Sequence, residues 1–118
     1  MNMKMSLGLL AIVLAPGLAA AKDDFSKSTP ALVEKGKPAY ATNCVTCHGE
    51  NMDGNGPAGA MMNPKPRDLV KGKYKKGNGP KQVFETITNG LKGTAMAGFN
   101  YIPEEDRWAI VHYIKSKK

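Results

Sequence analysis

The chain has 118 residues, and its 17 Lys and Arg outnumber its 10 Asp and Glu, which gives a formal net charge of +7. This length suits one domain and excludes a multidomain enzyme, while 42% hydrophobic and 23% charged residues exclude collagen-like and plainly disordered chains. Because 13 glycines and 8 prolines leave many positions outside regular structure, the core is thin without a disulfide, a metal or a cofactor.

Residues 1–21 have the three-part layout of a secretory signal peptide. One cation, Lys4, precedes the apolar run from Leu7 to Leu14, and the small residues at 19–21 form an A-x-A cleavage box. An uncleaved membrane anchor is the alternative, although the apolar run is shorter than the ~20 residues of a spanning helix. We therefore expect export, most simply to the bacterial periplasm, and cleavage that leaves residues 22–118 as one domain without stable membrane insertion.

Three later segments have the pattern of helices. The first begins near Thr29 and Pro30, a capping residue followed by a proline suited to the first helical position. Pro38 lies inside this segment, so a kink or a later start is expected there. The second covers about residues 80–89, and the third begins at Pro103, which three acidic residues follow. Since no stretch alternates like a strand, the predicted class is all-α.

The segment between the first two helices is unusually long. It runs from Gly49 to Pro80, whereas connections in compact domains are usually about 4 to 6 residues long. A long loop in a chain with little core needs something to wrap around. The sequence therefore points to a large buried cofactor.

Cys44-Val45-Thr46-Cys47-His48 is a C-x-x-C-H motif, which is the attachment signature of c-type haem. Two residues between the cysteines at the end of a helical segment place both sulfurs on one side, at a separation that matches the two vinyl groups of one haem. Each thiol can add to one vinyl group to form a thioether. The histidine that follows is then carried under the iron, where it can supply a ring nitrogen as an axial ligand.

Three other uses of the two cysteines are weaker. A thioredoxin-type C-x-x-C opens a helix after a strand, and this motif follows a helix instead. A zinc site needs four ligands, and the only further His or Cys is His112. A disulfide between residues so close in the chain has strained geometry.

The second axial ligand must reach the opposite face of the haem from a loop well downstream. Met96 fits this requirement, because small residues flank it and it lies between the second and third helices. Met52, Met61 and Met62 follow the motif too closely and are expected to have packing roles. His112 reads as an ordinary helical histidine. An open or weakly ligated iron is the alternative to Met96.

The chain resembles a small class I monohaem cytochrome c of the bacterial type over nearly all of residues 22–118. The stretch 64–69 is also similar to a loop common in the c-type subunits of bacterial terminal oxidases. The resemblance implies an all-α fold of three to four helices and long loops around one covalently bound haem c. It rests on Gly36 and Tyr40 ahead of the motif, Cys47-His48-Gly49, Gly54-Asn55-Gly56-Pro57-Ala58, Thr94-Ala95-Met96, and a closing helix with Trp108 and Tyr113.

The resemblance also implies roles for single residues near the haem. The carbonyl of Pro57 would accept the ring N–H of the haem histidine and so fix its tautomer. Arg67, and after it Tyr74 or Trp108, would bond a haem propionate, with a solvated Arg67 as the alternative. Ala97 stands where many relatives have proline, which implies a less rigid methionine loop.

A second set of roles that the resemblance implies concerns the contact between the first and last helices. In the family these helices cross, with a glycine and aromatic side chains where they meet. The residues implied here are Gly36, Tyr40, Trp108 and Tyr113.

His and Met ligation leaves no iron position for a substrate, and the soft thioether favours the reduced state. We therefore expect a one-electron carrier and not an enzyme. Two alternatives remain, namely a haem subunit of a larger oxidoreductase complex and a five-coordinate, peroxidase-like enzyme.

A cluster of basic residues follows the haem motif. It either forms a solvated loop or steers a monomeric protein onto acidic redox partners, and nucleic acid is not an expected partner. Its members, here called the basic cluster, are Lys65, Arg67, Lys71, Lys73, Lys75, Lys76 and Lys81.

Overall fold

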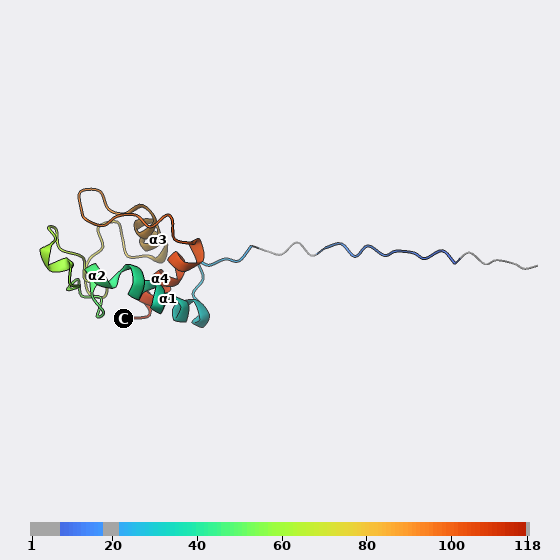
Figure 1. Ribbon diagram of the computed structural model, residues 1–118, viewed down its shortest axis with the longest axis horizontal. Coiled ribbons are helices and arrows are strands. Elements are labelled where there is room, and N and C mark those ends of the chain that lie inside the picture. The colour runs from blue at the N-terminus through green and yellow to red at the C-terminus, as the bar shows by residue number, and fades with distance from the viewer. Residues whose placement is uncertain (1–7, 18–21, 118) are drawn as a thin grey trace, which may run out of the picture.

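The computed structural model describes residues 8–17 and 22–117. Within these ranges the chain is helical and has no strand, which confirms the predicted class (Figure 1). The three predicted helices are all present, joined by a one-turn helix at the C-x-x-C-H motif and a short 3-10 turn. The elements are α1 (Pro30–Asn43), α2 (Val45–His48), η1 (Gly59–Met61), α3 (Pro80–Asn89) and α4 (Glu104–Lys115).

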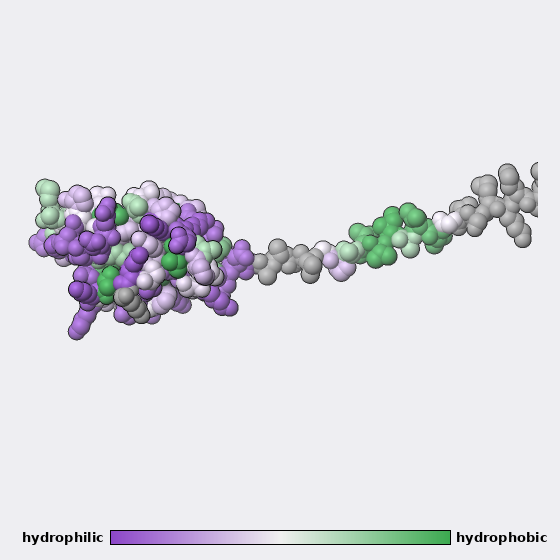
Figure 2. Space-filling view, turned by 90° about the horizontal axis from the view of Figure 1, so that it is seen from below, coloured by the Kyte–Doolittle hydropathy of each residue, from purple (hydrophilic) through white to green (hydrophobic). Residues whose placement is uncertain are grey.

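The N-terminal apolar run lies apart from the helical domain. Residues 8–17 have no regular structure and extend away from the helices as an exposed, largely apolar segment (Figures 1 and 2). The two ends of the predicted signal peptide, 1–7 and 18–21 with its cleavage box, lie outside the described residues, so cleavage stays a prediction. Within the described part of the chain, no helix is both long and apolar enough to cross a membrane.

Helix α1 begins where the capping pattern predicts. The Thr29 hydroxyl accepts a hydrogen bond from the backbone N–H of Leu32 at 3.2 Å, and Pro30 occupies the first turn, where its missing N–H costs nothing. The helix then continues through Pro38 to Asn43, so a start after Pro38 is wrong. Pro38 leaves the carbonyl of Glu34 without its helical donor, and this is tolerated because Glu34 is exposed to water.

Helices α1 and α4 cross in close contact, as the resemblance implies. A Cβ atom built on Gly36 would lie 2.0 Å from the carbonyl oxygen of Ala109, so only glycine lets the two backbones come this close. One turn further along α1, the ring of Tyr40 lies 5.6 Å from that of Tyr113, centroid to centroid. Gly36, Tyr40 and Tyr113 therefore lie where the two helices meet.

Trp108, the fourth residue implied at that crossing, packs against a different helix. Its ring stacks on Phe84 of α3, with the centroids 4.1 Å apart and the planes 11° from parallel. Trp108 therefore joins α4 to α3. With both neighbours in place, α4 forms the centre of the core, and Ile110 and Val111 are fully buried.

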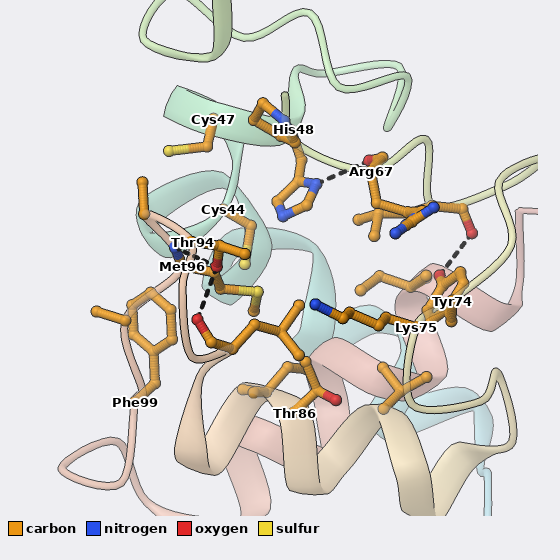
Figure 3. A pocket seen from close by; sticks show the side chains of 18 of the residues that line it. Cys44, Cys47, His48, Arg67, Tyr74, Lys75, Thr86, Thr94, Met96 and Phe99 are labelled. Carbon is orange, nitrogen blue, oxygen red and sulfur yellow. Dashed lines mark hydrogen bonds between the residues drawn. The ribbon is translucent and has the colours of Figure 1, made fainter. Parts of the chain in front are cut away.

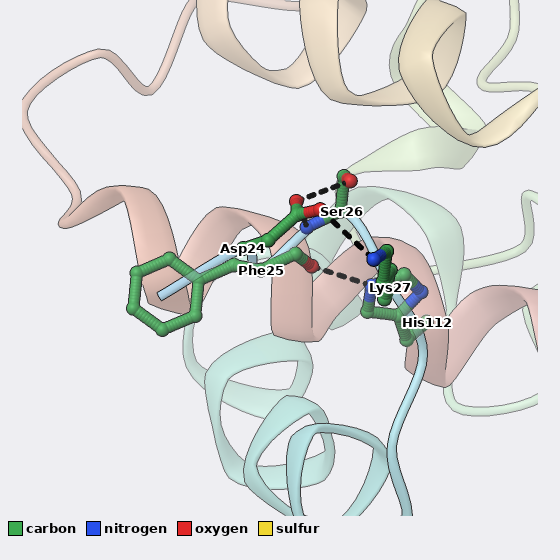
Figure 4. A network of polar contacts seen from close by, with 5 residues as sticks. All are labelled: Asp24, Phe25, Ser26, Lys27 and His112. Carbon is green, nitrogen blue, oxygen red and sulfur yellow. Dashed lines mark hydrogen bonds and ion pairs between the residues drawn. The ribbon is translucent and has the colours of Figure 1, made fainter. Parts of the chain in front are cut away.

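His112 holds the segment that precedes α1. It is buried, its Nε2–H donates to the carbonyl of Phe25 at 2.8 Å, and its ring stacks near Trp108 (Figure 4). Asp24 stabilises the same turn by accepting hydrogen bonds from Ser26. His112 thus has a structural partner and fills the ordinary helical role expected of it.

Candidate functional site

The C-x-x-C-H motif forms at the point where α1 passes into α2. The N–H of Cys44 donates to the carbonyl of Tyr40 at 2.8 Å, and the N–H of His48 donates to the carbonyl of Cys44 at 2.9 Å. These bonds wind the motif into a single turn, so Cys44, Cys47 and His48 all line one cavity of about 480 Å³ (Figure 3). The spacing of the motif therefore places its two thiols and its imidazole on one wall of the cavity, as the sequence predicts.

The burial of Cys44 argues against a redox-active use of the motif, and the absence of further ligands in the described chain argues against a metal-ion use. Both cysteines are free, and burial raises the pKa of the Cys44 thiol to about 12. A thiol with such a pKa is protonated at neutral pH, unlike the reactive thiolate of a redox-active C-x-x-C motif. No cluster of three or more His, Cys, Asp or Glu side chains suited to a metal ion occurs in residues 8–17 and 22–117.

His48 is held in the form that a metal requires. Burial lowers its pKa, against a smaller opposite effect of its hydrogen bond, so the ring is neutral. The Nδ1–H donates to the carbonyl oxygen of Arg67 at 3.0 Å, and the other ring nitrogen points into the cavity (Figure 3). A neutral imidazole with one nitrogen fixed by a carbonyl presents the lone pair of the other nitrogen to a metal.

The expected partner of His48, the carbonyl of Pro57, is therefore wrong, because Arg67 supplies that carbonyl. Hydrogen bonds from Gly56 to Cys47 and from Ala58 to Thr46 hold the segment around Pro57 along the backbone of α2. The later segment returns over Met52, which accepts a hydrogen bond from the N–H of Leu69 at 2.7 Å. This return brings the backbone of Arg67 beside the imidazole.

Met96 lines the same cavity from the loop between α3 and α4. Its N–H lies 3.2 Å from the Thr94 hydroxyl, its carbonyl accepts from the N–H of Leu91 at 3.1 Å, and Thr94 donates in turn to Leu91. These bonds stabilise the loop, although Ala97 stands where many relatives have a proline. Figure 3 shows the Met96 side chain directed into the cavity that His48 enters from α2.

The other three methionines of residues 22–117 have three different environments. Met52 is 2% exposed and packs in the core, as expected. Met61 is 91% exposed, so the packing role expected of it is wrong, because the end of η1 turns its side chain to solvent. Met62 lines the cavity, which the sequence did not reveal. It follows η1, whose Gly59 lies against the carbonyl of Cys47, so Met62 enters from the α2 side.

Of the three residues considered as propionate partners, Arg67 and Tyr74 line the cavity and Trp108 does not, because Trp108 faces α3. The Tyr74 hydroxyl donates to the carbonyl of Leu69 at 2.6 Å, and burial raises its pKa to about 12. The rest of the wall is mainly apolar and comes from α3, α4 and the methionine loop. These apolar residues are Val83, Ile87, Leu91, Phe99, Ile110 and Ile114.

The residues of this cavity fit a haem. Two neighbouring thiols can form the thioether bonds, and a neutral imidazole and a thioether are available to the iron. Apolar side chains match the faces of the ring, and cations stand near the cavity for its two carboxylates. A hydrophobic core that holds no cofactor would not need two thiols, an imidazole and cations beside its apolar side chains.

Comparison with known proteins places this geometry in context. A family model described as Cytochrome c matches residues 33–118. The chain is 40% identical over 67 residues to the Cbb3-type cytochrome c oxidase subunit CcoP of Azospirillum brasilense, a match that covers 57% of this chain and 22% of that protein. It is 39% identical over 69 residues to the subunit FixP of Azorhizobium caulinodans, covering 58% of this chain and 21% of that protein.

A solved structure gives the same result for the fold. The chain is similar to part of a reducing HAO-like protein complex of Kuenenia stuttgartiensis, with a TM-score of 0.68 and 30% identity over 78% of this chain and 43% of that one. The chain spans about a fifth of the length of the curated relatives it matches.

Proposed function

The chain belongs to the cytochrome c family, whose members carry covalently bound haem c, and from this premise we propose that it is an exported one-electron carrier with His48 and Met96 as the axial ligands. Cys44 and Cys47 would hold the haem. At each of them a new S–C bond forms to one carbon of a vinyl group, and the thiol hydrogen goes to the other carbon. When bound, the haem supplies an iron that changes between Fe(II) and Fe(III).

The observation that carries this proposal is the entry of His48 and Met96 into one cavity from different segments of the chain. His48 is neutral and fixed by Arg67, and Met96 is a soft ligand that favours the reduced iron. With both ligands bound, no iron position is left for a substrate. The arrangement therefore supports electron transfer over catalysis at the iron.

Absorption spectra of the oxidised and reduced holoprotein test the ligation. We expect a low-spin spectrum with the weak iron-to-sulfur band at the red end of the oxidised form. Met96→Ala should abolish this band and let carbon monoxide bind rapidly to the reduced protein. Met62→Ala is the matched control, because Met62 is also a methionine of the cavity wall but enters from the α2 side.

The outcomes separate the alternatives. Loss of the band in Met62→Ala but not in Met96→Ala would transfer the ligand role to Met62. Rapid carbon monoxide binding to the unaltered reduced protein would favour the five-coordinate, peroxidase-like alternative. Retention of the band in both variants would refute methionine ligation by either residue.

The basic cluster supports acidic redox proteins as partners. All seven of its members are exposed, and the ion pairs of the described residues, which join Lys27 to Asp24 and Lys35 to Glu105 and Asp106, include none of them. Several of these cations line the cavity, so an acidic partner attracted to them would be brought close to the haem.

The relatives favour a second candidate, because CcoP and FixP are oxidase subunits and the solved structure is of a protein complex. This chain could act as a haem subunit of such an assembly. Sedimentation of the native protein decides between the two. A haem-bearing monomer supports the free carrier, and comigration with other subunits supports the complex.

Export is tested by fractionation of the source cells followed by mass spectrometry of the N-terminus. A periplasmic protein that begins at Lys22 would support the signal peptide. A haem protein found in the membrane fraction with residues 1–21 still attached would support the uncleaved anchor.

A further inference from the structure

The basic cluster divides into two groups by position. Lys71, Lys73 and Lys81 do not line the cavity, and the remaining members do. The lining cations all lie in one stretch of chain, residues 65–76, which forms one part of the cavity wall. They are Lys65, Arg67, Lys75 and Lys76.

Several polar groups on this side already have other contacts. Lys65 donates to the side-chain oxygen of Asn55 at 2.5 Å. The aliphatic part of Arg67 lies against Gly72, because a Cβ on that glycine would meet Arg67 Cδ at 2.9 Å. Tyr74 has one hydroxyl proton, and Leu69 accepts it.

Lys75 is similar to Lys76 and to the Arg67 guanidinium in its lack of a partner within the described chain, and it is the lysine whose side chain Figure 3 shows in the cavity. No hydrogen bond or ion pair joins its ammonium group to another residue of the described chain. Figure 3 shows the Lys75 side chain entering the cavity beside Tyr74, opposite the wall that carries Cys47, with its ammonium group directed toward the middle of the cavity. Its ammonium group is exposed and has three donors, so it can donate to an anionic acceptor bound in the cavity.

The covalent structure of haem supplies that acceptor. Its two vinyl groups lie on one half of the ring and its two carboxylates on the other half. Attachment of the vinyl half to Cys44 and Cys47 therefore turns the carboxylate half toward the side of the cavity that Lys75 enters. We infer that Lys75 pairs with a haem carboxylate, and that this pair fixes the carboxylate edge of the ring against residues 65–76.

The pair has a consequence that can be measured at the iron. A fixed positive charge near the haem disfavours the oxidised form, which carries one more positive charge than the reduced form. Lys75 therefore raises the reduction potential as well as orienting the ring. The inference rests on the haem binding proposed above, and the spectra of the same samples report on that binding separately.

The test is a redox titration of the holoprotein at neutral pH with three variants. Lys75→Gln should lower the equilibrium constant for reduction by about two- to fifteenfold, for a charge roughly 10 Å from the iron in surroundings between water and a protein surface. This equals about 18 to 70 mV at 59 mV per tenfold change. Lys71→Gln removes the same charge outside the cavity and should change the potential much less. Lys75→Arg should keep the unaltered value.

The readouts distinguish the ways in which the inference can fail. Equal shifts of the reduction potential in Lys75→Gln and Lys71→Gln would mean that Lys75 acts only as one of several surface charges, and this would overturn the inference. No shift in Lys75→Gln would also overturn it. Loss of the iron-to-sulfur band in Lys75→Gln alone would place Lys75 in the support of the iron ligands and not at a carboxylate. An unaltered protein without covalent haem would instead refute the proposed function.

Discussion

The backbone carbonyl of Arg67 lies 3.0 Å from Nδ1 of His48, so a residue known for its charge acts on the candidate iron ligand through its main chain. The position of that carbonyl depends on Gly54, whose φ is +83° and whose hydrogens face the carbonyl of Pro66. The glycine lets segment 66–69 approach the turn that follows α2. The orientation of His48 is thus linked to a residue without a side chain.

Gly54→Ala is expected to disturb this link. The new Cβ would lie 2.3 Å from the carbonyl oxygen of Pro66, and the positive φ adds further strain, so we expect a loss of about 2–4 kcal/mol in unfolding free energy. Gly93→Ala is the matched control, because Gly93 has φ +76° but no atom within 4 Å of the added carbon. It should lose only about 1 kcal/mol.

Denaturant unfolding of the two holoproteins measures the difference, and the reduction potential shows whether His48 has moved. Equal losses in both variants would mean that backbone strain alone accounts for the effect. The contact between Gly54 and Pro66 would then have no separate role.

Gly36→Ala should weaken the crossing of α1 and α4. Alanine is favoured over glycine in a helix by about 1 kcal/mol, but its Cβ would overlap the carbonyl of Ala109 at 2.0 Å and Tyr113 Cβ at 2.6 Å. The steric overlap outweighs the helix propensity, and we expect a net loss of about 2–4 kcal/mol in unfolding free energy, measured by denaturant unfolding. Lys37→Ala, at an exposed position of the same helix, should change stability by less than about 0.5 kcal/mol. A gain in stability for Gly36→Ala would contradict this account.

The helices could be predicted from the sequence because their signals are local. The Thr29 cap, the proline starts of α3 and α4, and the apolar stripe of α4 act within a few residues of where they stand. The C-x-x-C-H motif is local in the same sense, and its three reactive side chains do line one cavity. Met96 could be selected because the loop on which it lies was evident from the flanking helices.

The errors arise where the outcome depends on contacts between distant segments. The acceptor for His48 is a backbone carbonyl. Every residue has such a carbonyl, so the identity of the residue does not show which one accepts the bond. Met61 and Met62 are identical neighbours, and only the turn at the end of η1 sends one to solvent and the other to the cavity. The different neighbours of Trp108 and Tyr113 could have been predicted, because a spacing of five residues places them about 140° apart around a helix.

Asp68 gives a prediction for acid conditions. Its carboxylate accepts hydrogen bonds from the N–H groups of Lys71 at 2.7 Å and Val70 at 2.9 Å, and these bonds hold its pKa below the ordinary value of 3.8. A lowered carboxyl pKa means that the stabilisation is complete above about pH 4 and is lost as the pH falls through the lowered value. The turn at residues 68–72 should therefore loosen in acid.

Thermal unfolding of Asp68→Ala measures this. Its midpoint should lie below that of the unaltered protein at about pH 6, and the difference should shrink as the pH falls through the lowered pKa, because the Asp68 carboxylate of the unaltered protein is then protonated. Asp23→Ala is the control, since Asp23 is exposed and takes part in no hydrogen bond of the described chain. A difference that stays constant with pH would show that the Asp68 carboxylate does not stabilise the turn through its charge.

The outer members of the basic cluster, Lys71, Lys73 and Lys81, should govern the salt dependence of electron transfer. Salt shortens the reach of charges, from a Debye length of about 30 Å at 0.01 M to about 10 Å at 0.1 M. Oxidation of the reduced protein by the anion ferricyanide should therefore slow several-fold over this range, because attraction to the cluster is screened. A cationic cobalt phenanthroline complex should show the opposite trend.

Replacing these three lysines by glutamine should flatten the ferricyanide salt profile. The matched control replaces Lys22, Lys37 and Lys117 by glutamine, which removes the same charge from exposed positions outside the cluster. Because both triple variants have the same net charge, a flatter profile in the first alone assigns the steering to the cluster. Equal flattening would mean that the overall charge attracts the reagent, and the solvated-loop reading of the cluster would then hold.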